Sequence, residues 1–123
     1  MASSDLEAWA AAYIEFQREP NRSETDPLWW AVEKFRSRDV NAEDCWRAIL
    51  QILCANPPQN VIAVLAAGPL ENLLVRHGAQ FIDRVEQESR ENAEFRYLLG
   101  GVWSSSIPWA VWHRVIAARA EEW

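Results

Sequence analysis

Apolar residues recur at helical spacing along almost the whole chain, and this periodicity limits the fold more than any other feature. A clear example runs from Phe95 to Trp103, with apolar side chains at i, i+3, i+4, i+7 and i+8. No stretch shows the sustained alternation of apolar and polar residues that marks a half-buried strand. The sequence therefore predicts an all-α fold.

Capping residues, prolines and glycines divide this pattern into about eight short helices. Side chains able to accept from free backbone N–H groups predict helix starts at Asp26, Asn41, Asn92 and Ser106. Gly68 and Gly78 are expected to end two successive short helices, with Gly78 in the left-handed conformation. We expect the helices to form a compact antiparallel stack of hairpins, α-solenoid-like, within a single domain over residues 1–123.

Two glycines near the end of this pattern allow two interpretations. Gly100 and Gly101 interrupt the helix that begins after Asn92. They either end it early or allow a neighbouring backbone to come close.

Charge and hydropathy limit the classes of partner. The chain has 18 acidic and 12 basic side chains, for a formal charge of −6, which disfavours nucleic acid and favours a basic protein. No apolar run reaches the roughly 20 residues of a membrane span, and Asp5 and Glu7 are unlike the basic start of a signal peptide. A cytoplasmic location without membrane contact is therefore predicted.

Residues that could carry catalysis form no familiar motif. The two cysteines, Cys45 and Cys54, project from opposite sides of one helix, so within it they neither pair nor share a metal. His77 is predicted to be a structural histidine on the inward face of the last turn of its helix, and His113 a solvated one. We therefore predict no catalytic residue, no cofactor and no metal, although folding could still bring His77 and Cys45 together.

Tryptophan is the most informative residue type, with eight in 123 residues. The inner face of the second helix directs Trp30 outward, together with Asp26 and Glu33, so that Trp30 is either covered by another helix or exposed. In the last helix Trp109 and Trp112 share one face, for which core packing is favoured over a partner groove. The predicted partner-binding residues are Asp26, Trp29, Trp30, Glu33, Trp109 and Trp112.

Several strings resemble a family of small bacterial all-helical proteins known only as a domain of unknown function. They are DCWRAILQIL, LAAGPLENLLVRHG, FIDRVE and FRYLLGGVW, and the resemblance covers about residues 26–119. It implies one bacterial cytosolic all-α domain and no assigned activity.

Two functional hypotheses follow, from different classes. The first is a non-enzymatic protein-binding domain, such as an immunity protein or antitoxin that neutralises a basic toxic partner. The alternative is a structural or adaptor module that forms a homodimer or docks on a larger complex. An enzyme with an unrecognised site ranks third.

Overall fold

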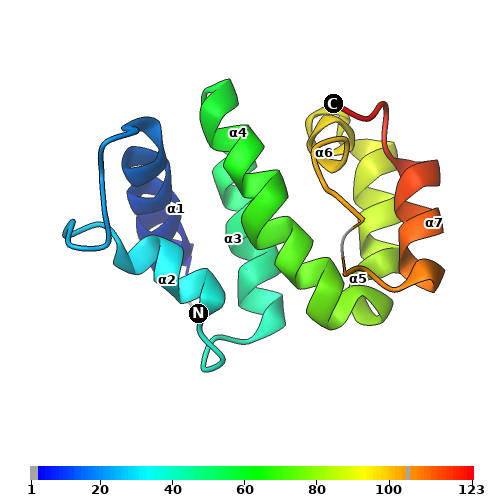
Figure 1. The fold of residues 1–123 in the computed structure, drawn as a ribbon, viewed down its shortest axis with the longest axis horizontal. Coiled ribbons are helices and arrows are strands. Elements are labelled where there is room, and N and C mark those ends of the chain that lie inside the picture. Colours follow the sequence, from blue (N-terminus) through cyan, green and yellow to red (C-terminus); the bar gives the residue numbers. More distant parts are fainter. Residues whose placement is uncertain (1–2, 105) are drawn as a thin grey trace. The chain divides into compact units, whose positions relative to one another are not determined.

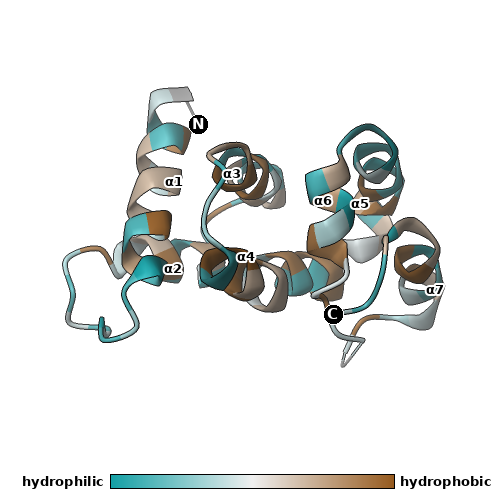
Figure 2. Ribbon diagram, turned by 90° about the horizontal axis from the view of Figure 1, so that it is seen from above, coloured by the Kyte–Doolittle hydropathy of each residue, from teal (hydrophilic) through white to brown (hydrophobic). Residues whose placement is uncertain are grey.

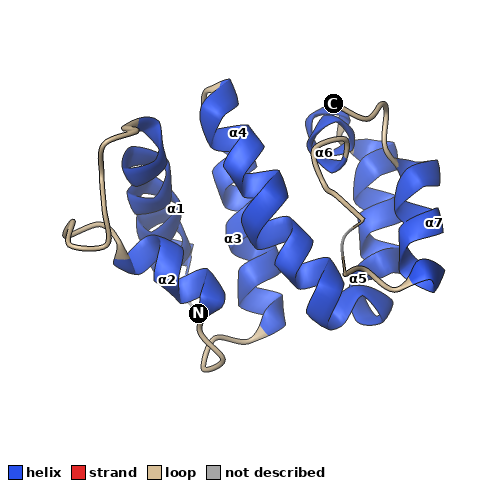
Figure 3. Cartoon of the chain, viewed as in Figure 1, coloured by secondary structure: helices blue, strands red, loops and turns tan. Residues whose placement is uncertain are grey.

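The computed structural model describes residues 3–104 and 106–123, and in this part of the chain it contains helices and loops but no strand (Figure 3). The predicted all-α class is confirmed. The elements are α1 (Ser3–Arg18), α2 (Trp30–Arg36), α3 (Ala42–Cys54), α4 (Gln59–Leu65), a π-helical turn η1 (Ala66–Leu70), α5 (Glu71–Glu91), α6 (Ala93–Leu99) and α7 (Trp109–Ala118) (Figure 1).

The chain divides into two compact units, Met1–Val64 and Leu65–Trp123. Each unit buries its own set of apolar side chains. The single domain and the solenoid-like stacking of hairpins over the whole chain stay predictions.

In the first unit, α1 packs against α2 and α3. The indole of Trp9 is fully buried, lies 4.4 Å from the ring of Phe35 between centroids, and donates through Nε1 to the carbonyl of Ala31 at 2.8 Å. Tyr13 packs edge-on to the same phenyl ring, and its burial raises its pKa. The connection between α1 and α2 is largely hydrophilic (Figure 2). A buried aromatic cluster thus fixes the inner face of α2.

Two of the predicted helix caps are confirmed. The side chain of Asn41 accepts from the backbone N–H of Asp44 at 2.8 Å at the start of α3. Asn92 does the same for Glu94 and Phe95 at the start of α6. The predicted cap at Ser106 is wrong, because α7 begins after Pro108 with no side-chain cap.

The predicted end of a helix at Gly68 is also wrong. The helical chain continues from α4 through η1 into α5, with Pro69 inside the π-helical turn. Proline has no N–H to donate, and its ring collides with the carbonyl four residues before it, so a wider turn accommodates it without ending the helix.

The expected stop at Gly78 is replaced by a bend one residue earlier. No glycine among the described residues has a positive φ, and α5 runs on to Glu91. His77 interrupts the regular helix, with φ −136° and ψ 22°. With α4, η1 and α5 counted as one run that is kinked at His77, the described chain has six helical runs where about eight separate helices were predicted.

In the second unit, α5 packs against α6 and α7, and Gly78 lies where α5 meets α7. A Cβ at position 78 would lie 2.9 Å from Cγ1 of Val111. Val111 and Val115 are the buried residues of α7. Gly78 therefore permits a close approach that sets the inner face of α7.

Gly100 and Gly101 satisfy both alternatives left open by the sequence. Helix α6 ends at Leu99, and a Cβ on Gly101 would lie 2.5 Å from the ring of Trp123. That indole stacks on Tyr97 at 5.1 Å between centroids and donates to the Tyr97 carbonyl at 2.6 Å. The glycines end the helix and make room for the segment that follows α7.

Replacing Gly78 by alanine tests the close approach of α5 and α7. Glycine to alanine inside a helix normally stabilises by about 0.5–1 kcal/mol. At Gly78 the branched side chain of Val111 has to move, so we expect a net loss of about 1–2 kcal/mol in the free energy of unfolding, measured in urea.

Gly68→Ala is the matched control, because an added Cβ there meets nothing within 4 Å. It should leave the stability unchanged or raise it. If Gly78→Ala stabilises the chain as much as the control does, the two helices do not approach each other as described.

Candidate functional site

The six predicted partner-binding residues fall into two groups. Asp26, Trp29, Trp30 and Glu33 lie in and before α2 in the first unit, and Trp109 and Trp112 lie on α7 in the second.

Trp30 is exposed, which decides between the two alternatives for this residue. Its side chain is 42% accessible, while Ala31, Val32 and Phe35 form the buried face of α2. The ammonium of Lys34 lies 5.8 Å from the centroid of the Trp30 ring. The exposed indole is therefore partly engaged by a cation of its own helix.

The side chains of Trp29 and Glu33 bind each other. Trp29 is half-buried against Phe16, with ring centroids 5.6 Å apart, and its Nε1 donates to a carboxylate oxygen of Glu33 at 3.2 Å. The guanidinium of Arg36 lies 5.3 Å from the Trp29 ring. These contacts hold α2 against α1 and leave Trp29 little surface for a partner.

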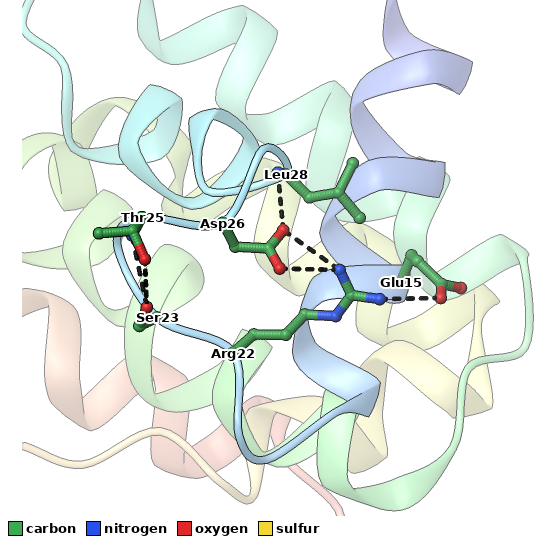
Figure 4. A network of polar contacts seen from close by, with 6 residues as sticks. All are labelled: Glu15, Arg22, Ser23, Thr25, Asp26 and Leu28. Carbon is green, nitrogen blue, oxygen red and sulfur yellow. Dashed lines mark hydrogen bonds and ion pairs between the residues drawn. The ribbon is translucent and has the colours of Figure 1, made fainter.

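Asp26 has a structural role in the loop before α2 (Figure 4). Its carboxylate accepts from Nη1 of Arg22 at 3.0 and 3.1 Å and from the backbone N–H of Leu28 at 2.8 Å. Arg22 reaches on to Glu15 at 3.3 Å, and the Asp26 side chain is only 19% exposed. Asp26 thus stabilises the turn before α2 and is paired with Arg22, but the predicted helix start at Asp26 is wrong, because α2 begins at Trp30 and has no side-chain cap.

The last helix presents a different surface. Trp109 is 72% exposed and Ile116 is exposed, and Trp112 between them is half-buried. At about 100° per residue these three side chains fall within about 60° of one another, with Trp109 about 120–160° from Val111 and Val115 and Trp112 next to Val115. The favoured interpretation of core packing is therefore wrong for Trp109. We call Trp109, Trp112 and Ile116 the α7 surface.

Two local contacts support the α7 surface. Arg119 lies 5.5 Å from the ring centroid of Trp112. The imidazole of His113 lies 5.8 Å from the Trp109 ring between centroids, with Nδ1 3.0 Å from the Trp109 carbonyl oxygen. His113 is exposed, as its sequence context predicted.

An ion-pair cluster fixes α7 on α5. Arg114 donates to Glu86 at 2.5 and 2.9 Å and to Asp83 at 2.6 Å. The hydrogen bonds from Arg114 lower the pKa of Glu86, and those carboxylates in turn raise the pKa of Arg114. The residue that donates to Glu86 thus lies 28 residues away in the sequence, on another helix.

One exposed aromatic residue was missed by the sequence reasoning. Trp103 was placed on an inner helical stripe, but it lies beyond the end of α6 and is 67% exposed. Its backbone N–H donates to the Glu71 carboxylate at 3.1 Å. The two glycines before it were the signal that the helix had already ended.

The candidate catalytic residues belong to different units, Cys45 and Cys54 to the first and His77 to the second. His77, predicted to face inward, is exposed, as is Cys54, while Cys45 is half-buried. Over residues 3–104 and 106–123 no three His, Cys, Asp or Glu side chains are grouped in a way that could hold a metal ion. In the same residues no helix combines the length and the apolar character needed to cross a bilayer.

Comparison with known families supplies one match. The sequence model of a family of unknown function (DUF6869) matches residues 18–123. The chain belongs to this family. The match extends beyond both ends of the resemblance described above, and it includes α7 and the residues that follow it. No curated protein and no solved structure matches.

The ion-pair cluster predicts how stability depends on acid. Because the pKa of Glu86 is lowered in the folded chain, its contribution is complete above the ordinary value of 4.5 and is lost as the pH falls through the lowered value. Arg114→Gln should lower stability at about pH 7 and reduce the further loss between about pH 5 and pH 3.

Urea unfolding at several pH values measures this difference, with Arg76→Gln as a control for the loss of one positive charge from the exposed surface of the same unit. If the free energy of unfolding depends on pH in the same way for the wild type and Arg114→Gln, the ion pair does not stabilise the folded state.

Proposed function

We propose that this chain is a non-catalytic protein-binding domain and that the α7 surface anchors its partner, a basic protein. The observation that carries the proposal is the exposure of Trp109, at 72%, on the same helical face as Trp112 and Ile116. Tryptophan is among the residue types that most often dominate the binding energy of protein interfaces.

The α7 surface suits this role better than the group around α2. In that group Asp26 is neutralised by Arg22, and Trp29 and Glu33 bind each other. On α7, Trp109 and Ile116 stay open while the valines on the other face of the helix make its packing contacts. A partner that covers the α7 surface therefore gains apolar burial without breaking a hydrogen bond between side chains of the site.

Charge supports a basic partner. The formal charge of −6 attracts a positively charged surface and raises the rate of encounter. Binding should accordingly weaken as salt is raised.

An immunity protein or antitoxin of the bacterial cytoplasm is the specific form of this function that we propose. Such a protein has to cover a functional surface of a toxic, basic partner, for which an acidic chain with an aromatic anchor is suited. The alternative of self-association rests on the same observation, because an exposed apolar helical face can also pair with its copy around a two-fold axis.

Trp109→Ala tests the proposal against a matched control. Trp103→Ala removes a tryptophan of similar exposure that lies outside the α7 surface. Tagged wild-type and variant chains are incubated with lysate of the native cells, and recovered proteins are quantified by mass spectrometry. We expect a basic protein that is recovered by wild type and Trp103→Ala but lost with Trp109→Ala.

Binding to that protein is then measured with purified components. Trp109→Ala should raise the Kd about 30-fold or more, which corresponds to about 2 kcal/mol. Trp103→Ala should change it less than about twofold, and circular dichroism should show that both variants fold. The proposal is wrong if no recovered protein depends on Trp109, or if the only species that does so is a second copy of the chain.

A further inference from the structure

A separate pocket lies among α5, α6 and α7 in the second unit. It has a volume of about 370 Å³, within the range of small-molecule sites. It is lined by Glu86, Ser89, Arg90, Arg96, Ala117 and Ala118. None of these belongs to the α7 surface, so the pocket is independent of the proposed function.

The hydroxyl of Ser89 is the first indication of a ligand. Ser89 is 2% exposed, and within the described part of the chain its Oγ has no hydrogen-bond partner. A buried hydroxyl without a partner is destabilising. Such a group in the wall of a pocket is satisfied when a bound molecule accepts a hydrogen bond from it.

The hydrogen-bonding groups of the lining are the second indication. Arg90 and Arg96 contribute two guanidinium groups. Both carboxylate oxygens of Glu86 already accept hydrogen bonds from Arg114. Arg119 follows the lining residue Ala118 and has a buried Nη1 without a hydrogen-bond partner among the described residues. The lining therefore offers a ligand mainly hydrogen-bond donors.

The net charge at the pocket is close to zero. Arg90, Arg96 and Arg114 carry three positive charges against two negative charges on Asp83 and Glu86, and the last turns of α5 and α7 add roughly half a negative charge each. The carboxylate of Glu86 in the lining is already bound by Arg114, whereas the lining arginines are donors for an acceptor group. The donors, and not the net charge, favour an anionic ligand over a cationic one.

We infer that this pocket binds a small molecule through an oxyanion, a phosphate or carboxylate group. The guanidinium groups of Arg90 and Arg96 would donate to the oxyanion, since arginine matches the geometry of both groups. Ser89 would add a neutral donor after rotation about its single side-chain torsion. Ala117 and Ala118 leave space for the remainder of the molecule.

The test uses the full chain labelled with ¹⁵N and titrated with inorganic phosphate, acetate or chloride at constant ionic strength. We expect saturable chemical-shift changes in the amides of Ser89, Arg96 and Ala118 with phosphate, acetate or both, and none that saturate with chloride. Saturation by phosphate alone identifies a phosphate ligand, and saturation by acetate alone a carboxylate.

Three variants locate the binding. Arg96→Gln and Ser89→Ala should weaken it, with a tenfold or greater effect for Arg96→Gln. Arg76→Gln removes an exposed charge from the other end of α5 and should change it less than twofold. Should Arg96→Gln fail to fold, Arg90→Gln at an exposed position gives the same comparison. The inference is overturned if no anion saturates these shifts, or if Arg76→Gln weakens binding as much as the pocket variants do.

Discussion

The contact between Gly78 and Val111 determines how α7 lies on α5, and the character of the second unit follows from it. Because position 78 has no Cβ, the valine side chain reaches the backbone of α5, where an added carbon would lie 2.9 Å from it. Val111 and Val115 therefore point inward, and Arg114 comes within reach of Asp83 and Glu86. The apolar contact of Val111 with α5 and the ion pairs of Arg114 with α5 thus fix the same rotation of α7 about its axis. That rotation leaves Trp109 and Ile116 in solvent.

The two groups of candidate binding residues differ in how many of their polar groups already have partners within their own unit. Around α2, polar side chains already bind each other within the unit: Arg22 donates to Asp26, and Glu33 accepts a hydrogen bond from Trp29. On α7 the exposed indole of Trp109 contacts only the neighbouring His113 among the ring pairs described. Contiguous exposed apolar patches often mark interaction sites, which is why the α7 surface carries the proposal. The pocket that contains Ser89 is the reverse case, a polar site with an unsatisfied donor.

The sequence predicts those features that depend on neighbours a few residues away. Helical periodicity gave the fold class, and Asn41 and Asn92 cap helices as their spacing indicated. Rules that use only neighbouring residues failed where contacts between residues far apart in the sequence determine the structure. Gly78 follows the rule for a helix end, but it serves the packing of a helix about 30 residues later. The ion pair of Glu86 with Arg114 spans 28 residues, beyond the reach of helical spacing within α5. The apolar arc of α7 is wide enough to allow either face to be buried, so the sequence left the exposure of Trp109 open.

The central claim is that α7 turns its valines inward and its tryptophan stripe outward. The most direct measurement is ¹⁹F NMR of the full chain labelled with 5-fluorotryptophan, with each resonance assigned by a single Trp→Phe variant. The change in chemical shift between H₂O and D₂O reports the solvent exposure of each indole. The structure predicts a large shift for Trp109, an intermediate one for Trp112, and almost none for Trp9 and Trp46, which are buried. A Trp109 resonance as insensitive to solvent as that of Trp9 would contradict this account.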